Sequence, residues 1–107
     1  MGPGVLSRPT AFRWAKIDWD RYMPEISRFL GIVIRMYIRD HHPAHFHAEY
    51  GEYEITVDVE KGVVTGKFPR RALNAVLDWY VLHQDELMAN WNAAMNRKPL
   101  TKIDPLE

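Results

Sequence analysis

The chain has 107 residues, of which 47% are hydrophobic and 12% aromatic, and its 14 basic and 14 acidic side chains cancel to a formal net charge of zero. This balance predicts one folded unit with a single packed core. It excludes a largely disordered chain and a protein that a strong global field steers onto nucleic acid. The chain contains no cysteine, which excludes disulfides and a cysteine-based zinc site, and it has no apolar run of about 18 residues that could span a membrane.

Residues 1–22 show neither helical nor strand periodicity, and they contain Gly2, Pro3, Gly4 and Pro9. We therefore predict an N-terminal extension over residues 1–22, either disordered or partly packed, followed by a single α+β domain over residues 23–107. The first residues lack the basic segment and continuous apolar stretch of a secretory signal, so we expect a cytoplasmic protein.

From Ile26 onward, apolar and polar residues alternate with the period of two that is typical of strands. The alternation is clearest in three stretches and weaker in a fourth: 31–39, 45–50, 52–59 and 63–68. In the third stretch we expect Tyr53, Ile55, Val57 and Val59 to face inward. Because the connections between these stretches are short, the pattern predicts an antiparallel β-meander of four to five strands.

After Pro69 the spacing of apolar residues becomes helical and continues to about Met95. The pattern fits one long helix or a helix pair with a break near His83, a residue that we assign to helix packing or the helix surface. The predicted fold is therefore an α+β sandwich in which the meander packs on this C-terminal helix or helix pair.

One face of the predicted sheet is polar, because residues two apart on a strand point to the same side. We expect this face to collect basic, aromatic and acidic side chains: Arg35, Tyr37, Arg39, His45, His47, Glu49, Glu52, Glu54, Thr56 and Asp58. An exposed sheet face is usually polar, but this one holds most of the residue types used in acid–base and phosphate chemistry.

Four of the five histidines lie in the segment His41-His42-Pro43-Ala44-His45-Phe46-His47. His45 and His47 are spaced as i and i+2 on one strand, which places their Cα atoms roughly 6.6 Å apart on the same face. This spacing suits two ligands of one divalent metal, with Asp40, His41 or Glu49 as the third. The metal-ligand candidates are thus His41, His45, His47 and Glu49, although no complete metal motif is present.

The same residues suit acid–base catalysis, since an unperturbed imidazole titrates near ~6.5. In a metal-independent RNA cleavage, His45 and His47 would act as base and acid, and Arg35 or Arg39 would stabilise the phosphorane charge. Tyr37 would stack on a base or relay a proton. The carboxylates of the face count against RNA binding, because they repel a phosphate backbone.

A series of short motifs also resembles a known family. They stand in the order Met23-Pro24-x-Ile26, Asp40-His41-x-Pro43-x-His45-x-His47, Tyr50-Gly51-Glu52-Tyr53, Phe68-Pro69-x-Arg71-Ala72-Leu73, Trp79 and Glu86-Leu87. This order is similar to that of a small bacterial family catalogued as a domain of unknown function, DUF4160. The resemblance covers roughly residues 23–105, and the histidine–proline segment is its most specific part.

The resemblance implies a short bacterial protein that is often encoded beside a second small protein, in a toxin–antitoxin-like module. It supplies no catalytic residues. We therefore expect a component of such a module with a small protein partner, and we hold open an RNA-cleaving toxin, a non-catalytic protein-binding half such as an antitoxin, and a metal-binding domain. Whether the chain is an enzyme stays open, and a divalent metal is the one cofactor that its residues suggest.

Overall fold

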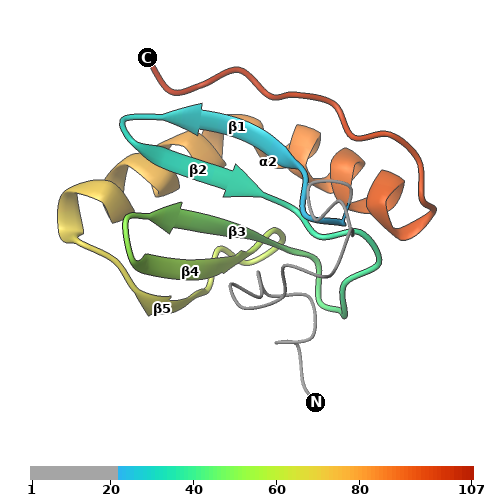
Figure 1. Cartoon of the computed structure of the whole chain (residues 1–107), viewed down its shortest axis with the longest axis horizontal. Coiled ribbons are helices and arrows are strands. Elements are labelled where there is room, and N and C mark those ends of the chain that lie inside the picture. Colours follow the sequence, from blue (N-terminus) through green and yellow to red (C-terminus); the bar gives the residue numbers. More distant parts are fainter. Residues whose placement is uncertain (1–21) are drawn as a thin grey trace, which may run out of the picture.

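The computed structural model describes residues 22–107, so the predicted extension lies outside the described residues except for Tyr22. Five strands form one antiparallel sheet in chain order, and one helix follows (Figure 1). Their bounds are β1 Glu25–Phe29, β2 Ile32–Arg35, β3 His45–Tyr50, β4 Tyr53–Asp58, β5 Val64–Lys67 and α2 Arg70–Met95. The α+β meander with a C-terminal helix is confirmed.

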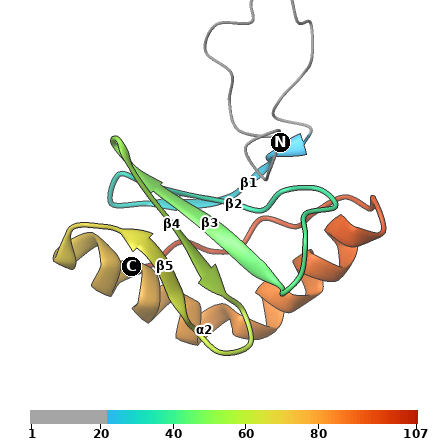
Figure 2. The ribbon, with the colours of Figure 1, turned by 90° about the horizontal axis from the view of Figure 1, so that it is seen from below.

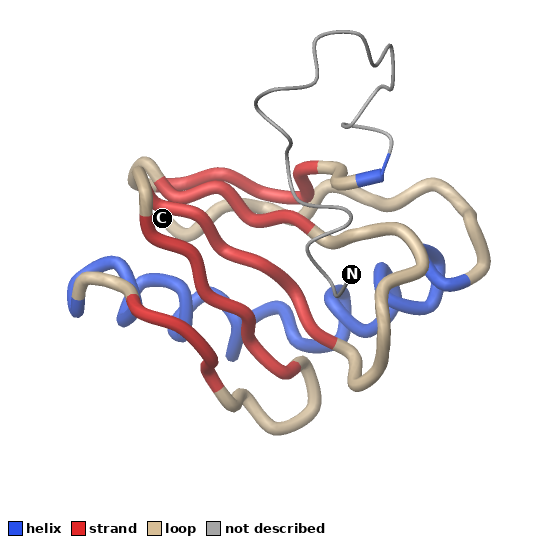
Figure 3. Tube along the Cα trace, turned by 60° about the horizontal axis from the view of Figure 1, so that its bottom comes forward, coloured by secondary structure: helices blue, strands red, loops and turns tan. Residues whose placement is uncertain are grey.

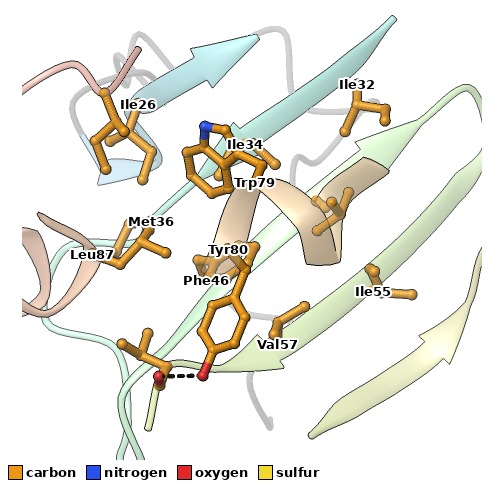
Figure 4. Close-up of a cluster of buried hydrophobic side chains, with 14 of the residues drawn as sticks. Ile26, Ile32, Ile34, Met36, Phe46, Ile55, Val57, Trp79, Tyr80 and Leu87 are labelled. Atoms are coloured by element: carbon orange, nitrogen blue, oxygen red, sulfur yellow. Dashed lines mark hydrogen bonds between the residues drawn. The ribbon is translucent and has the colours of Figure 1, made fainter. Parts of the chain in front are cut away.

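Helix α2 lies across one face of the sheet (Figure 2). Between these two layers lies a core of fully buried side chains that includes Trp79, Phe46, Ile34, Met36 and Leu87 (Figure 4). The Tyr80 hydroxyl donates a hydrogen bond of 2.7 Å to the Val59 carbonyl. Figure 4 marks this bond of the labelled Tyr80 with a dashed line. The alternation in β3 and β4 accounts for the core, since Phe46, Ile55 and Val57 are at most 1% exposed.

Strand β2 ends at Arg35, four residues before the predicted end at Arg39. The chain beyond it still pairs with backbone, but its partners precede β1: Met36 N donates to the Pro24 carbonyl and Ile38 N donates to the Tyr22 carbonyl. Arg39 then adopts the left-handed φ of 57°, which no strand continues through. The pairing partner of residues 36–38 is remote in sequence, so the local alternation could not reveal where the regular strand stops.

Tyr53 corrects a second expectation, because its side chain is 43% exposed instead of inward. It lies opposite Tyr50 at the tip of the β3–β4 hairpin. In β5, Gly66 has a φ of 110°, and a Cβ there would lie 2.6 Å from the Glu54 carbonyl oxygen. Only glycine fits this close approach of two backbones.

Helix α2 is continuous from Arg70 to Met95, but His83 has non-helical angles (φ −126°, ψ 23°) that kink it. Of the two predicted alternatives, one long helix or a helix pair with a break near His83, the structure has one long helix with a kink at His83. The helix ends in a Schellman motif, in which Arg97 N donates to the Ala94 carbonyl and Lys98 N donates to the Ala93 carbonyl. Arg97 occupies the left-handed position of this motif with a φ of 55°.

Residues 97–107 run back beside β1, as the red tail in Figure 1 shows, and Ile103 N donates to the Ile26 carbonyl. Among residues 22–107, no helix has the length and apolar character needed to cross a membrane.

Candidate functional site

Asp40 belongs to the loop that leads into β3 (the tan segment between β2 and β3 in Figure 3). Its carboxylate lies at the centre of a group of histidines. Its Oδ2 lies 2.9 Å from His45 Nε2 and 3.2 Å from His47 Nε2. Its Oδ1 lies 2.8 Å from His41 Nδ1 and accepts the backbone N–H of the same residue. We refer to Asp40, His41, His45 and His47 as the Asp–His cluster.

The second ring nitrogen of each inner histidine also faces an acceptor. His45 Nδ1 donates to the Pro43 carbonyl at 2.7 Å, and His47 Nδ1 lies 3.1 Å from Glu54 Oε2. Both rings are buried, with His45 8% and His47 9% exposed. Each ring is thus held at both nitrogens, which fixes its orientation.

The surroundings shift the ionisation of this cluster. Burial is the largest influence on Asp40 and would raise its pKa, but hydrogen bonds from His45, His47 and the His41 backbone together hold that pKa well below the usual range. Burial likewise would lower the pKa of His47, but its hydrogen bonds with Asp40 and Glu54 outweigh burial and raise it. Asp40 is therefore a carboxylate at physiological pH.

The cluster lines a pocket with a volume of about 470 Å³ on the sheet face opposite α2. Other parts of its wall come from β4 and β5, including Thr56 and Thr65, which are paired neighbours in the ladder. Tyr37 lies flat on His47, with ring centroids 4.0 Å apart and an interplanar angle of 5°. The Tyr37 side chain is only 7% exposed, so one face of its ring is used for packing.

Three members of the cluster have the arrangement of metal ligands. Asp40, His41 and His45 each offer one ligand atom, and these atoms all lie within 4.8 Å of one another. Asp40 and His45 are held by the loop and by β3, whereas His41 is exposed and can adjust its ring. Such a group could hold a metal ion, since carboxylate oxygen and imidazole nitrogen are common ligands.

The structure places two predicted site residues beside the cluster but gives them other partners. Arg35 is paired with His47 in the β2–β3 ladder, yet its guanidinium contacts Glu49 Oε1 at 3.4 Å and donates to the Met23 carbonyl at 2.8 Å. Glu49, a predicted metal ligand, therefore faces Arg35 instead of the cluster. The other predicted ligands, His41, His45 and His47, do come together around Asp40.

Arg39 lies outside the pocket. Its left-handed backbone directs it to a separate groove formed with the residues that follow α2. Of the five residues proposed from sequence for acid–base chemistry, the structure thus brings together Tyr37, His45 and His47, and it leaves both arginines elsewhere.

Sequence reasoning gave too little weight to two carboxylates. Asp40 was one of three options for a third ligand, but it is the residue that every histidine of the cluster contacts. Glu54 was placed on the polar face without a role, and it orients His47. The register of β3 against β4 carried the signal for Glu54, because it pairs with Glu49, two residues from His47 and on the same face.

The fold and the cluster define a class of small α+β protein, with an antiparallel meander on one helix and an aspartate–histidine group in a pocket of the sheet. The sequence profile of a family described as a domain of unknown function (DUF4160) matches residues 31–92, and the chain belongs to this family. This confirms the resemblance inferred from the motifs. No curated protein and no solved structure matches the chain.

Proposed function

We propose that this protein binds one divalent transition-metal ion through Asp40, His41 and His45. The observation that carries the proposal is the hydrogen bonding of His45. Its Nδ1 must be the N–H donor, because the Pro43 carbonyl can only accept. In a neutral imidazole, Nε2 then carries a lone pair, and this lone pair faces the Asp40 carboxylate at 2.9 Å.

Two lone pairs at this distance repel each other unless a cation is shared between them. Either a proton makes His45 an imidazolium or a metal ion lies between His45 Nε2 and Asp40. The orientation is the one that metal-binding histidines adopt, since they usually donate the ring N–H that is not on the metal to a carbonyl or carboxylate. His47 would hold Asp40 in place through Nε2, with Glu54 fixing the other side of its ring.

The ligand set favours a transition metal such as zinc, nickel or manganese. One carboxylate oxygen and two imidazole nitrogens suit these ions, whereas calcium and magnesium prefer a shell of oxygens. Three protein ligands leave a coordination position open, and the cluster lines the 470 Å³ pocket. A small molecule in that pocket would therefore reach the ion.

This geometry supports acid–base catalysis less well than it supports metal binding. Both nitrogens of His47 face carboxylates of the protein, and His45 is left with Nε2 alone, which the proposed metal ion would occupy. Among the described residues that line the pocket there is no arginine or lysine to stabilise a phosphorane. RNA cleavage and the two-protein module remain predictions from the sequence.

The test is metal content and affinity of the untagged protein, by elemental mass spectrometry and by calorimetric titration with Zn²⁺, Ni²⁺ and Mn²⁺. We expect one equivalent of one of these ions in the wild type. Asp40→Asn and His45→Ala should lose it, and His47→Ala should bind about 10–100-fold more weakly, because Asp40 loses a partner that orients it.

His83→Ala is the matched control, since it removes a histidine that packs on Trp79 and contacts Glu86 on α2. Circular dichroism of each variant checks that the fold is kept. A folded wild-type protein that takes up none of the three ions, or a loss of binding in His83→Ala equal to that in Asp40→Asn, would refute the metal site.

A further inference from the structure

A second groove, separate from the Asp–His cluster, lies where the loop after β2 meets the end of α2. Its volume is about 680 Å³. Three cations line it, namely Arg39, Arg97 and Lys98, and all three are exposed. The remaining wall is aromatic and apolar, with Tyr22, Ile38 and Leu100 among its residues.

Among residues 22–107, the side chains that line this groove carry an excess of positive charge, although the whole chain is neutral. No carboxylate of residues 22–107 lines it. None of its three cations forms an ion pair within the described part of the chain. Arg28 and Arg35, by contrast, have Glu25 and Glu49 as partners. Three unpaired cations around one hollow favour an anionic ligand.

The backbone supplies an independent observation. Arg39 and Arg97 have φ values of 57° and 55°, in the left-handed region that disfavours side chains with a Cβ. Arg97 holds the position of the Schellman motif at which glycine is the usual residue. Glycine would be easier to accommodate at that position, although an arginine there also interacts favourably with the negative end of the helix dipole. Backbone strain of this kind is concentrated at functional sites.

We infer that this groove binds nucleoside phosphates, either free or within a single strand. Guanidinium groups match phosphate oxygens with paired hydrogen bonds, and a lysine adds a point charge. The Tyr22 ring, 47% exposed, and the apolar wall offer a surface on which a flat base stacks. An acidic peptide would use the cations but not the stacking surface. The inference goes beyond the metal site and does not depend on it.

The groove and the cluster are joined by the chain itself, since Arg39 directly precedes Asp40. The left-handed turn at Arg39 sends the two side chains to different hollows. A nucleotide held by Arg39 would therefore lie on the other side of this turn from the proposed metal ion.

Arg97→Gly is the informative variant. Because glycine suits the left-handed position, the melting temperature should stay equal or rise, whereas the affinity for a fluorescein-labelled octauridylate should fall about tenfold or more, as for loss of a charge-assisted hydrogen bond. Fluorescence anisotropy at several salt concentrations measures the binding. With three phosphate contacts, log K should fall with log salt at a slope of about −2.

Arg71→Glu is the control that matches Lys98→Glu in charge, because Arg71 is exposed at the opposite end of α2. It should bind as the wild type does. Competition by AMP and ATP that is as effective per phosphate as the oligonucleotide would assign the site to free nucleotides, and weaker competition would assign it to single strands.

Four outcomes would overturn the inference. The wild type does not bind octauridylate, AMP or ATP at 50 mM salt or below. Alternatively, Arg97→Gly and Lys98→Glu bind like the wild type, or the control loses as much affinity as they do. Displacement by polyglutamate but not by nucleotides would also overturn it, and would identify an acidic protein segment as the ligand. Metal content of Arg97→Gly should equal that of the wild type, which keeps this result separate from the metal proposal.

Discussion

Tyr80 and Gln84 share one acceptor, the carbonyl of Val59 at the end of the sheet. The Tyr80 hydroxyl donates at 2.7 Å and Gln84 Nε2 donates at 2.8 Å. Burial raises the pKa of Tyr80, so the neutral, donating form is favoured. Two side chains from successive turns of α2 therefore anchor the helix to the residue that follows β4, and neither is the sole partner of that carbonyl.

Tyr80→Phe should consequently cost only about 0.5–1.5 kcal/mol of unfolding free energy, the net contribution of one hydrogen bond. The Val59 carbonyl keeps Gln84 as a donor and is not left unsatisfied. Urea unfolding followed by circular dichroism measures this cost. In a Gln84→Ala background the same substitution should cost about 1–3 kcal/mol, because the carbonyl then loses its last donor. Equal costs in both backgrounds would show that the two donors act independently.

At the scale of single elements, the residues after α2 are held by side chains instead of by regular structure. The Asn90 amide donates to the Thr101 carbonyl and accepts the Thr101 N–H, both at 2.8 Å. Trp79 Nε1 donates to the Asp104 carbonyl at 2.8 Å. Asn90 is 3% exposed, so this pair of hydrogen bonds is shielded from water.

Asn90→Ala removes both of these hydrogen bonds and leaves two backbone groups of Thr101 without their partner. We expect a loss of about 2–3 kcal/mol in unfolding free energy, the sum of two net contributions and part of the desolvation cost. Asn92→Ala is the matched control, because Asn92 is exposed on the same helix. It should change stability by less than ~0.5 kcal/mol. A similar loss for both variants in urea titration would mean that the C-terminal segment adds little to stability.

Periodic elements could be predicted from the sequence because their signal is local. The helical spacing after Pro69 and the interruption at His83 correspond to α2 and its kink. The alternation around Phe46 and Ile55 corresponds to β3 and β4. The tail at residues 97–107 has no period, and its contacts with Asn90 and Ile26 depend on tertiary packing, so no sequence pattern pointed to it.

The part of the candidate site that lies on a regular strand was predictable from the sequence. The rule that residues i and i+2 share a face placed His45 and His47 together, and they are together. It failed for Arg39, because residues 36–39 leave the strand and Arg39 reverses the chain. It also could not rank Asp40 above His41 and Glu49, since the loop conformation that brings Asp40 to His45 is not periodic.

At the scale of the whole molecule, a metal ion that binds only the folded state should raise the melting temperature. At 100 times the dissociation constant, such a ligand stabilises by about 2.7 kcal/mol, which corresponds to about 10–20 °C for a domain of this size. This rise in melting temperature is an upper limit, because any affinity of the unfolded chain for the ion reduces it. Differential scanning fluorimetry with and without metal measures the shift, which EDTA should reverse. Asp40→Asn should show no shift, and a shift of the wild-type size in that variant would place the ion elsewhere.

The three proposed ligands all lie between positions 40 and 45 of the chain. Bringing them around one ion closes a very short loop, and the entropy of closing such a loop is small. A peptide of residues 38–48 therefore carries the same donors, and what it lacks is the pre-orientation that Glu54 gives His47, and through it Asp40, in the folded protein. The unfolded chain would keep part of the affinity, so the ion would act as an early local chelate during folding and stabilise the native state by less than its full binding energy.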